Sequence, residues 1–168
     1  FSASIPATAH SAGEMLRWAV TATDTTANAA RSPAFLDAGG DSQSPEYYGT
    51  VIPDAGLTSN LPIFQWFTSN VSGSHTRTGA RASVSFRGRF YDNVFVRQRG
   101  GATNGSISQK FDFNKGEPFY IDETMPEVDE INLNGNGSDS TYARQPLAFQ
   151  TYRDTGHAAC ECALWQIQ

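Results

Sequence analysis

The residues best suited to chemistry lie in residues 90–113, where two alternating segments flank a small, polar, Gly-rich loop. Arg97 and Arg99 precede the loop, and Lys110 follows it. A Gly-rich loop lets backbone N–H groups approach an anion closely, and these three cations could neutralise its charge. The pattern therefore indicates a phosphate-binding loop. It lacks Walker A spacing, so the alternative remains a hairpin bend whose arginines lie along the protein surface.

Composition limits the protein class. The 168 residues are 39% hydrophobic and 12% aromatic, which is enough for one ordinary domain with a packed core. The 15 Gly and 8 Pro favour many turns and β structure. A net charge of −5 disfavours a general nucleic-acid binder, although residues 77–99 are locally basic and residues 117–139 acidic. No apolar run approaches the ~20 residues that a membrane helix needs.

The sequence also leaves three other kinds of site possible, for zinc, for calcium and for carbohydrate. Cys160 and Cys162 pair badly with each other on a strand, and with His157 they make only half of a zinc site. Residues 134–139 place oxygen ligands close together, but their spacing does not fit the twelve-residue calcium loop of an EF-hand. The aromatic residues could form a carbohydrate platform, although aromatic side chains more often form the core.

The first part of the chain indicates a hairpin. Residues 15–23 alternate as a half-buried strand, residues 24–28 form a turn, and residues 30–36 form a short return. This string resembles the penultimate strand and hairpin of fibronectin-type or immunoglobulin-like modules in secreted bacterial proteins, except that Ala27 stands where Gly is common. Residues 1–37 are therefore interpreted as the tail of a β-sandwich-like module, and residues 38–45 as a linker.

The remainder, residues 46–168, predicts an antiparallel α+β domain with one packed helix. Strands are expected at residues 46–53, 61–67, 81–90, 93–99, 107–113, 128–133 and 160–168, with a tight hairpin turn at Asp92–Asn93. The helix begins after Gly137 and ends near Gly156, and Pro146 implies a late start or a kink. The expected core is Leu61, Ile63, Phe64, Phe86, Val94, Val96, Phe111, Phe113, Ile131, Leu133, Leu147 and Phe149.

Five ordered blocks carry a family resemblance. They are Leu-Pro-Ile-Phe at residues 61–64, Asp-Asn-Val-Phe-Val-Arg-Gln-Arg-Gly at 92–100, Lys-Phe-Asp-Phe-Asn-Lys at 110–115, Val-Asp-Glu-Ile-Asn-Leu at 128–133, and Arg-Gln-Pro-Leu-Ala-Phe-Gln-Thr-Tyr-Arg-Asp-Thr-Gly at 144–156. In this order they make residues 47–168 similar to the spore-coat protein H (CotH) kinase family, in the form found in large secreted bacterial proteins.

The resemblance implies the N-terminal lobe of an atypical protein kinase, which uses ATP and a divalent metal such as Mg²⁺ to phosphorylate protein Ser or Thr. Residues 100–106, with Gly100, Gly101 and Ser106, would form the nucleotide-facing loop. Lys110 would contact the phosphates, and Arg97 or Arg99 could assist. Protein substrates or neighbouring domains would be the partners, with no nucleic acid and no membrane span, in a secreted or cell-surface location.

Two departures from the kinase pattern matter. The helix carries Gln145 and Gln150 on its central turns and an acid, Asp154, only at its far end, so the usual ion pair to the phosphate-binding lysine is not evident. The family's catalytic carboxylates lie downstream of the region matched here, so this chain alone is not expected to be a working kinase. The alternative function is a non-catalytic extracellular structural or interaction module.

Overall fold

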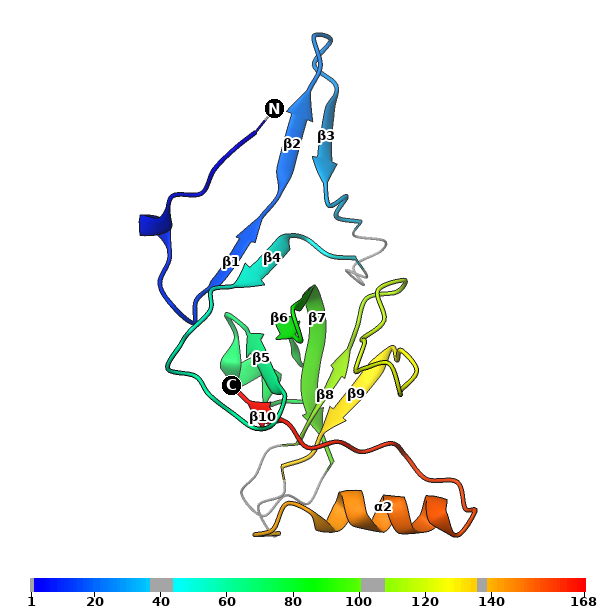
Figure 1. The fold of residues 1–168 in the computed structure, drawn as a ribbon. Coiled ribbons are helices and arrows are strands. Elements are labelled where there is room, and N and C mark those ends of the chain that lie inside the picture. The colour runs from blue at the N-terminus through cyan, green and yellow to red at the C-terminus, as the bar shows by residue number, and fades with distance from the viewer. Residues whose placement is uncertain (1, 37–43, 101–107, 136–138) are drawn as a thin grey trace.

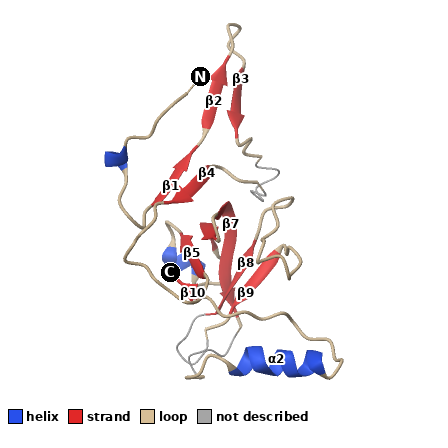
Figure 2. Ribbon diagram, viewed as in Figure 1, coloured by secondary structure: helices blue, strands red, loops and turns tan. Residues whose placement is uncertain are grey.

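The computed structural model describes residues 2–36, 44–100, 108–135 and 139–168. In these ranges the fold is α+β, with many strands, few helices and a curled sheet that is mostly antiparallel (Figures 1 and 2). This confirms the α+β class predicted from the sequence. None of the described helices combines the length and apolar character that crossing a bilayer requires.

The elements follow one another along the chain in this order. They are the 3₁₀ turn η1 (Ala7–Ala9), the strands β1 (Met15–Trp18), β2 (Val20–Thr23), β3 (Ala29–Ser32), β4 (Tyr48–Val51) and β5 (Ile63–Phe67), the helix α1 (Val71–Ser74), the strands β6 (Ala80–Phe86), β7 (Arg89–Arg99), β8 (Ser108–Asp112) and β9 (Glu130–Leu133), the helix α2 (Arg144–Asp154) and the strand β10 (Gln166–Ile167).

The central sheet has the strand order β10-β5-β6-β7-β8-β9. Strands β5 to β9 are antiparallel neighbours in chain order, since strands consecutive in sequence usually lie side by side in a sheet. Strand β10 pairs in parallel with β5, with Gln166 opposite Ile63. The expected strand over residues 160–168 is thus reduced to two residues at the edge of the sheet.

Aromatic rings fill the concave side of this sheet. Phe119, on the segment between β8 and β9, is fully buried. Its ring centroid lies 4.7 to 6.0 Å from those of five other rings, which are Phe64, Phe86, Tyr91, Phe113 and Trp165. Such offset and edge contacts add to the free energy gained from burying the apolar surface. Strands therefore supply most of the core, and connecting segments add Phe113, Phe119 and Trp165 to it.

Most of the expected core is confirmed. Seven of its members are buried, namely Phe64, Phe86, Val94, Val96, Phe111, Phe113 and Ile131, and Leu133 packs against them. The expectation is wrong for Leu61 and Leu147, whose side chains are 43% and 64% exposed. Ile63 and Phe149 are half-buried and lie outside the cluster.

The predicted hairpin turn at Asp92–Asn93 is wrong. The turn between β6 and β7 is Arg87–Gly88, and both residues have positive φ values, 48° and 78°, as a two-residue hairpin turn of type I′ requires. Asp92 and Asn93 instead lie inside β7, where the pairing with β6 shifts register between Ala82 and Val84. Asn93 has a φ of 55°, which marks the irregularity as a β-bulge.

The predicted strand over residues 15–23 is divided at Ala19 into two strands that pair with different partners. Strand β1 pairs with β4, and β2 pairs with β3 through the predicted turn, so the β2–β3 ribbon projects away from the central sheet (Figure 1). Residues 38–43 of the expected linker lie outside the described residues, and the division into two modules stays a prediction. The β1–β4 pairing nevertheless joins the two sides of that linker.

Helix α2 does not pack on the sheet, contrary to expectation. It buries none of its residues, and Figure 1 draws it (orange) below the strands. Leu147 and Phe149 are two positions apart, about 200° around the helix, so they cannot form one apolar stripe. The predicted end is close to the observed one, but the helix begins at Arg144, several residues after Gly137, which agrees with the late start that Pro146 implied. Pro146 lies in the first turn, and Gly156, with a φ of 80°, follows the last turn, where His157 N donates to Tyr152 O at 2.9 Å.

Candidate functional site

The β7–β8 pairing places three predicted site cations on one face of the sheet. Arg97 lies directly opposite Lys110, and Arg99 lies opposite Ser108. Side chains alternate along strands, so Arg97, Arg99 and Lys110 emerge on the face opposite to the one where Phe111 enters the core. The cations therefore line one face beside the connection between the two strands.

Two carboxylates hold the Lys110 ammonium in place. Its Nζ lies 3.0 Å from Asp112 Oδ1 and pairs also with the Glu130 carboxylate on β9. The side chain of Lys110 is only 19% exposed. Hydrogen bonds to Glu130 and then to Asp112 raise the pKa of Lys110, against the lowering effect of burial, so the group stays a cation at neutral pH. Arg97 Nε lies 3.7 Å from Asp112 Oδ2, so Asp112 stands between the two cations.

The end of β7 is open and bounded by polar groups. Gly100 has a φ of 75°, and a Cβ added to it would meet no atom of the described residues within 4 Å. Arg77 Nη2 donates to the Gly100 carbonyl at 3.0 Å, and Arg99 Nη1 donates to Asn134 Oδ1 at 2.8 Å. We call Arg77, Arg97, Arg99, Gly100 and Lys110 the loop mouth. The predicted site residues Gly101 and Ser106 lie outside the described residues.

Sequence reasoning missed four contributors to this site. Asp112 lies two positions after Lys110 on β8, and Glu130 lies opposite Asp112 on β9. Alternation along the two strands could therefore have placed both carboxylates on the same face as Lys110. Arg77 and Asn134 lie on loops, where no periodic signal exists. Their contacts with Gly100 and Arg99 depend on the tertiary path of the chain.

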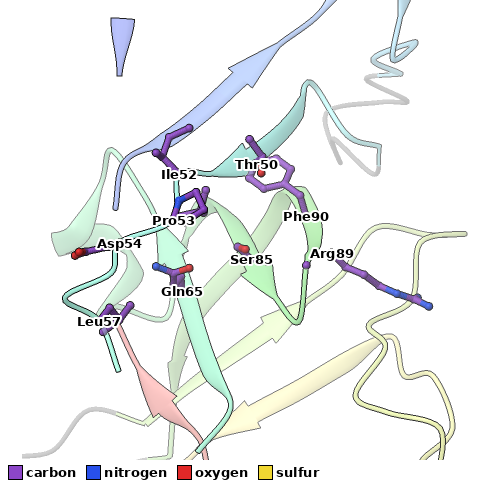
Figure 3. Close-up of a pocket in the computed structure, with 11 residues that line it drawn as sticks. Thr50, Ile52, Pro53, Asp54, Leu57, Gln65, Ser85, Arg89 and Phe90 are labelled. Carbon is purple, nitrogen blue, oxygen red and sulfur yellow. The ribbon is translucent and has the colours of Figure 1, made fainter. Parts of the chain in front are cut away.

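A surface pocket lies elsewhere on the sheet. It encloses about 230 Å³ and lies at the β6–β7 hairpin, and its lining includes Ile52, Pro53, Gln65, Ser85 and Phe90 (Figure 3). Arg89 and Arg99 mark the two ends of β7, so this pocket and the loop mouth are separated by the whole strand. The Arg89 side chain points away from the other lining residues, and it pairs with Glu127 at 3.2 Å.

The geometry gives little support to the zinc, calcium and carbohydrate sites that the sequence left possible. In the described ranges, no three His, Cys, Asp or Glu side chains come together as a metal site. Cys160 and Cys162 are free thiols, and burial raises the pKa of Cys162. Residues 136–138 of the possible calcium loop lie outside the described residues. Among the aromatic residues, Trp66 and Trp165 pack against the core.

Compared with protein-family models, curated proteins and solved structures, the chain gives no match. A function for it is therefore argued from the sequence resemblance and from the geometry of the loop mouth.

Proposed function

We propose that this chain contributes the phosphate-binding N-terminal lobe of a secreted, CotH-like atypical protein kinase of bacterial origin. The observation that carries the proposal is the direct cross-strand pairing of Arg97 with Lys110 beside the open end of β7. The polyphosphate of ATP is the ligand that such a pair of cations suits. The Gly-rich connection after Gly100 would supply backbone donors.

The electrostatic repulsion between Arg97 and Lys110, which lie opposite each other, supports a binding role for the pair. Like charges directly opposite each other on neighbouring strands destabilise a sheet. Here Asp112 and Glu130 offset that repulsion, since both contact Lys110 and Asp112 also approaches Arg97. A neutral residue at position 97 or 110 would remove the repulsion without any compensating carboxylate. Retaining both cations is understandable if a ligand with several negative charges uses them.

The donor chemistry fits a nucleotide phosphate. The ammonium of Lys110 has three N–H donors, and Asp112 and Glu130 engage two of them. The guanidinium of Arg99 has five donors, one of which contacts Asn134. Remaining donors at both groups can bind phosphate oxygens. The divalent metal would neutralise phosphate charge, and the resemblance implies that its protein ligands come from outside this lobe.

A second candidate is a non-catalytic extracellular interaction module. The observation in its favour is the exposed apolar surface of α2, where Leu147 and Tyr152 are 64% and 56% exposed. Where exposed apolar side chains form one contiguous patch, that patch commonly marks a contact surface. In this reading the kinase-like sheet would serve as a scaffold, and the loop mouth would bind no nucleotide.

Isothermal titration of the chain with Mg-ATP separates the two candidates. We expect saturable binding that Lys110→Ala weakens about tenfold or more, since a hydrogen bond to a charged group contributes about 1.5–3 kcal/mol. Lys115→Ala is the matched control, because Lys115 is the other lysine of the chain and is exposed on the turn after β8. Equal affinity of the two variants would remove Lys110 from the site. No heat with the unaltered chain would favour the scaffold reading.

A further inference from the structure

Three polar side chains from separate parts of the fold form a chain of hydrogen bonds beside the loop mouth. Arg99 Nη1, at the end of β7, donates to Asn134 Oδ1 at 2.8 Å. Asn134 Nδ2 donates in turn to Gln145 Oε1, in the first turn of α2, at 2.9 Å. The Asn134 amide thus uses its oxygen for the strand and its nitrogen for the helix, so both contacts require one orientation of the amide.

Helix α2 has little else to fix its position. It buries no residue. Of the side-chain hydrogen bonds within the described ranges, Asn134–Gln145 is the one that joins α2 to the segment following β9. The helix's other contacts run to its own flanks, from Asp139 to Arg144 N and from Arg153 to the Cys160 carbonyl. The position of the helix start therefore depends on Asn134.

The segment that carries Asn134 is itself held against the sheet. Gly135 N donates to Ser108 Oγ at 3.2 Å, and Ser108 is the first residue of β8, opposite Arg99. Asn134 follows β9 directly, after Leu133. The Asn134 amide therefore has the strands that border the loop mouth on one side and helix α2 on its other side.

We infer that Asn134 is a positioning residue that couples Arg99 at the loop mouth to helix α2. A phosphate group competes with Asn134 Oδ1 for the Arg99 guanidinium, because a phosphate is charged and can accept two parallel N–H bonds from an arginine, whereas the amide oxygen is neutral. When Arg99 turns to the phosphate, the Asn134 amide loses the partner that orients it, and its bond to Gln145 weakens. Occupancy of the loop mouth then loosens the start of α2.

The ligand-driven step rests on the proposed function, whereas the coupling exists in the free protein and is tested there first. Amide hydrogen exchange of α2 is measured in a double-mutant cycle of Arg99→Ala and Gln145→Ala. Each variant is expected to speed exchange in residues 145–150 about threefold, the effect of losing one exposed hydrogen bond, and the double variant to add nothing further. Arg97→Ala is the matched control, because Arg97 lies on the same face of β7 and contacts Asp112 instead.

Additive effects, or no effect of Arg99→Ala, would overturn the coupling. Thermal melts of all four proteins check that the sheet remains folded, so a global loss of stability is distinguished from local loosening of α2. Asn134→Leu provides a second variant. Its side chain, of similar size, can neither accept from Arg99 nor bond to Gln145, so α2 should exchange as fast as in Gln145→Ala.

The same exchange measurement with saturating Mg-ATP tests the ligand-driven step. We expect faster exchange at the start of α2 in the unaltered chain and no further change in Gln145→Ala. Binding heat without any change in α2 exchange would overturn the ligand-driven loosening. Absence of binding heat would overturn the proposed function instead, while the cycle in the free chain still decides whether Asn134 couples Arg99 to the helix.

Discussion

The carboxylate of Asp92, in the bulge of β7, accepts the backbone N–H of Tyr47 at 2.8 Å. The same carboxylate accepts the N–H of Glu46 at 3.1 Å and the hydroxyl of Ser83 at 2.6 Å, and Arg17 Nη1 lies 3.6 Å away. Asp92 is 2% exposed. One buried carboxylate therefore fixes the segment before β4 to the central sheet, and the bulge is what turns its side chain toward that segment.

Replacing this carboxylate should destabilise the whole chain. In Asp92→Asn, one acceptor oxygen becomes a donor facing other donors, so we expect a loss of about 3 kcal/mol in the free energy of unfolding. Urea unfolding followed by tryptophan fluorescence measures the loss. Asp129→Asn is the control, since Asp129 is exposed and the same change there should cost less than about 0.5 kcal/mol. Equal losses in the two variants would show that the Asp92 network is not stabilising.

Gly49 should tolerate no side chain. A Cβ at this position of β4 would lie 2.3 Å from the Phe90 ring. We expect Gly49→Ala to cost about 1–3 kcal/mol through overpacking. Phe90→Leu shortens the opposing side chain, so the same glycine substitution should cost less in that background. An undiminished cost in the double variant, measured by urea unfolding, would contradict a clash with Phe90.

The β2–β3 turn should respond to acid at an unusually low pH. The Asp24 carboxylate accepts hydrogen bonds from the side chain and backbone of Asn28 and from Thr26, which lower the pKa of Asp24 from 3.8 to about 2. Because the folded pKa is depressed, the stabilisation is present above pH 3.8 and is lost as the pH falls toward 2.

NMR titration of the Thr26 and Asn28 amides provides the measurement. We expect both resonances to shift together with a midpoint near 2. Asp24→Asn should abolish the transition. A midpoint at 3.8, the ordinary value for an aspartate, would mean that the turn does not hold the carboxylate in solution.

Phe119 should be among the most costly residues to truncate. It is fully buried and contacts five other rings. Phe119→Ala should lower the free energy of unfolding by about 3–5 kcal/mol. Phe35→Ala removes a ring of the same size that is 36% exposed, and should cost much less. Similar losses of unfolding free energy in Phe119→Ala and Phe35→Ala would show that Phe119 is not central to the core.

The sequence revealed strands better than turns. Alternation of apolar and polar residues located β6, β8 and β9, because each has one face in the core, and a dense apolar run of strand length located β5. A turn was wrongly predicted at Asp92–Asn93 because Asp and Asn usually favour turns. Here Ser83, Tyr47 and Asn114 satisfy the pair from distant positions, which no local pattern reveals.

Local backbone conformation was partly foreseeable. Ala27 stands where Gly is common in such turns, and its φ of 67° explains why a residue without a Cβ would suit that position. At the site, alternation relates Arg97 to Arg99 on one face of β7, but that Lys110 shares this face depends on the β7–β8 register. Asn134 and Arg77 were not foreseeable, because loop residues have no period. The helix was located by its flanking residues, but its failure to pack depends on where the chain places it.

The stacking of Trp165 on Phe64, with ring centroids 5.6 Å apart, joins positions separated by about a hundred residues. Beside it, β10 covers the outer edge of β5. Contacts of such long sequence separation close late, because the chain must first lose the entropy of a large loop. During synthesis, the aromatic interior would remain incomplete until the segment containing Trp165 has left the ribosome. Until then, β5 presents an unpaired edge with which other nascent chains can associate.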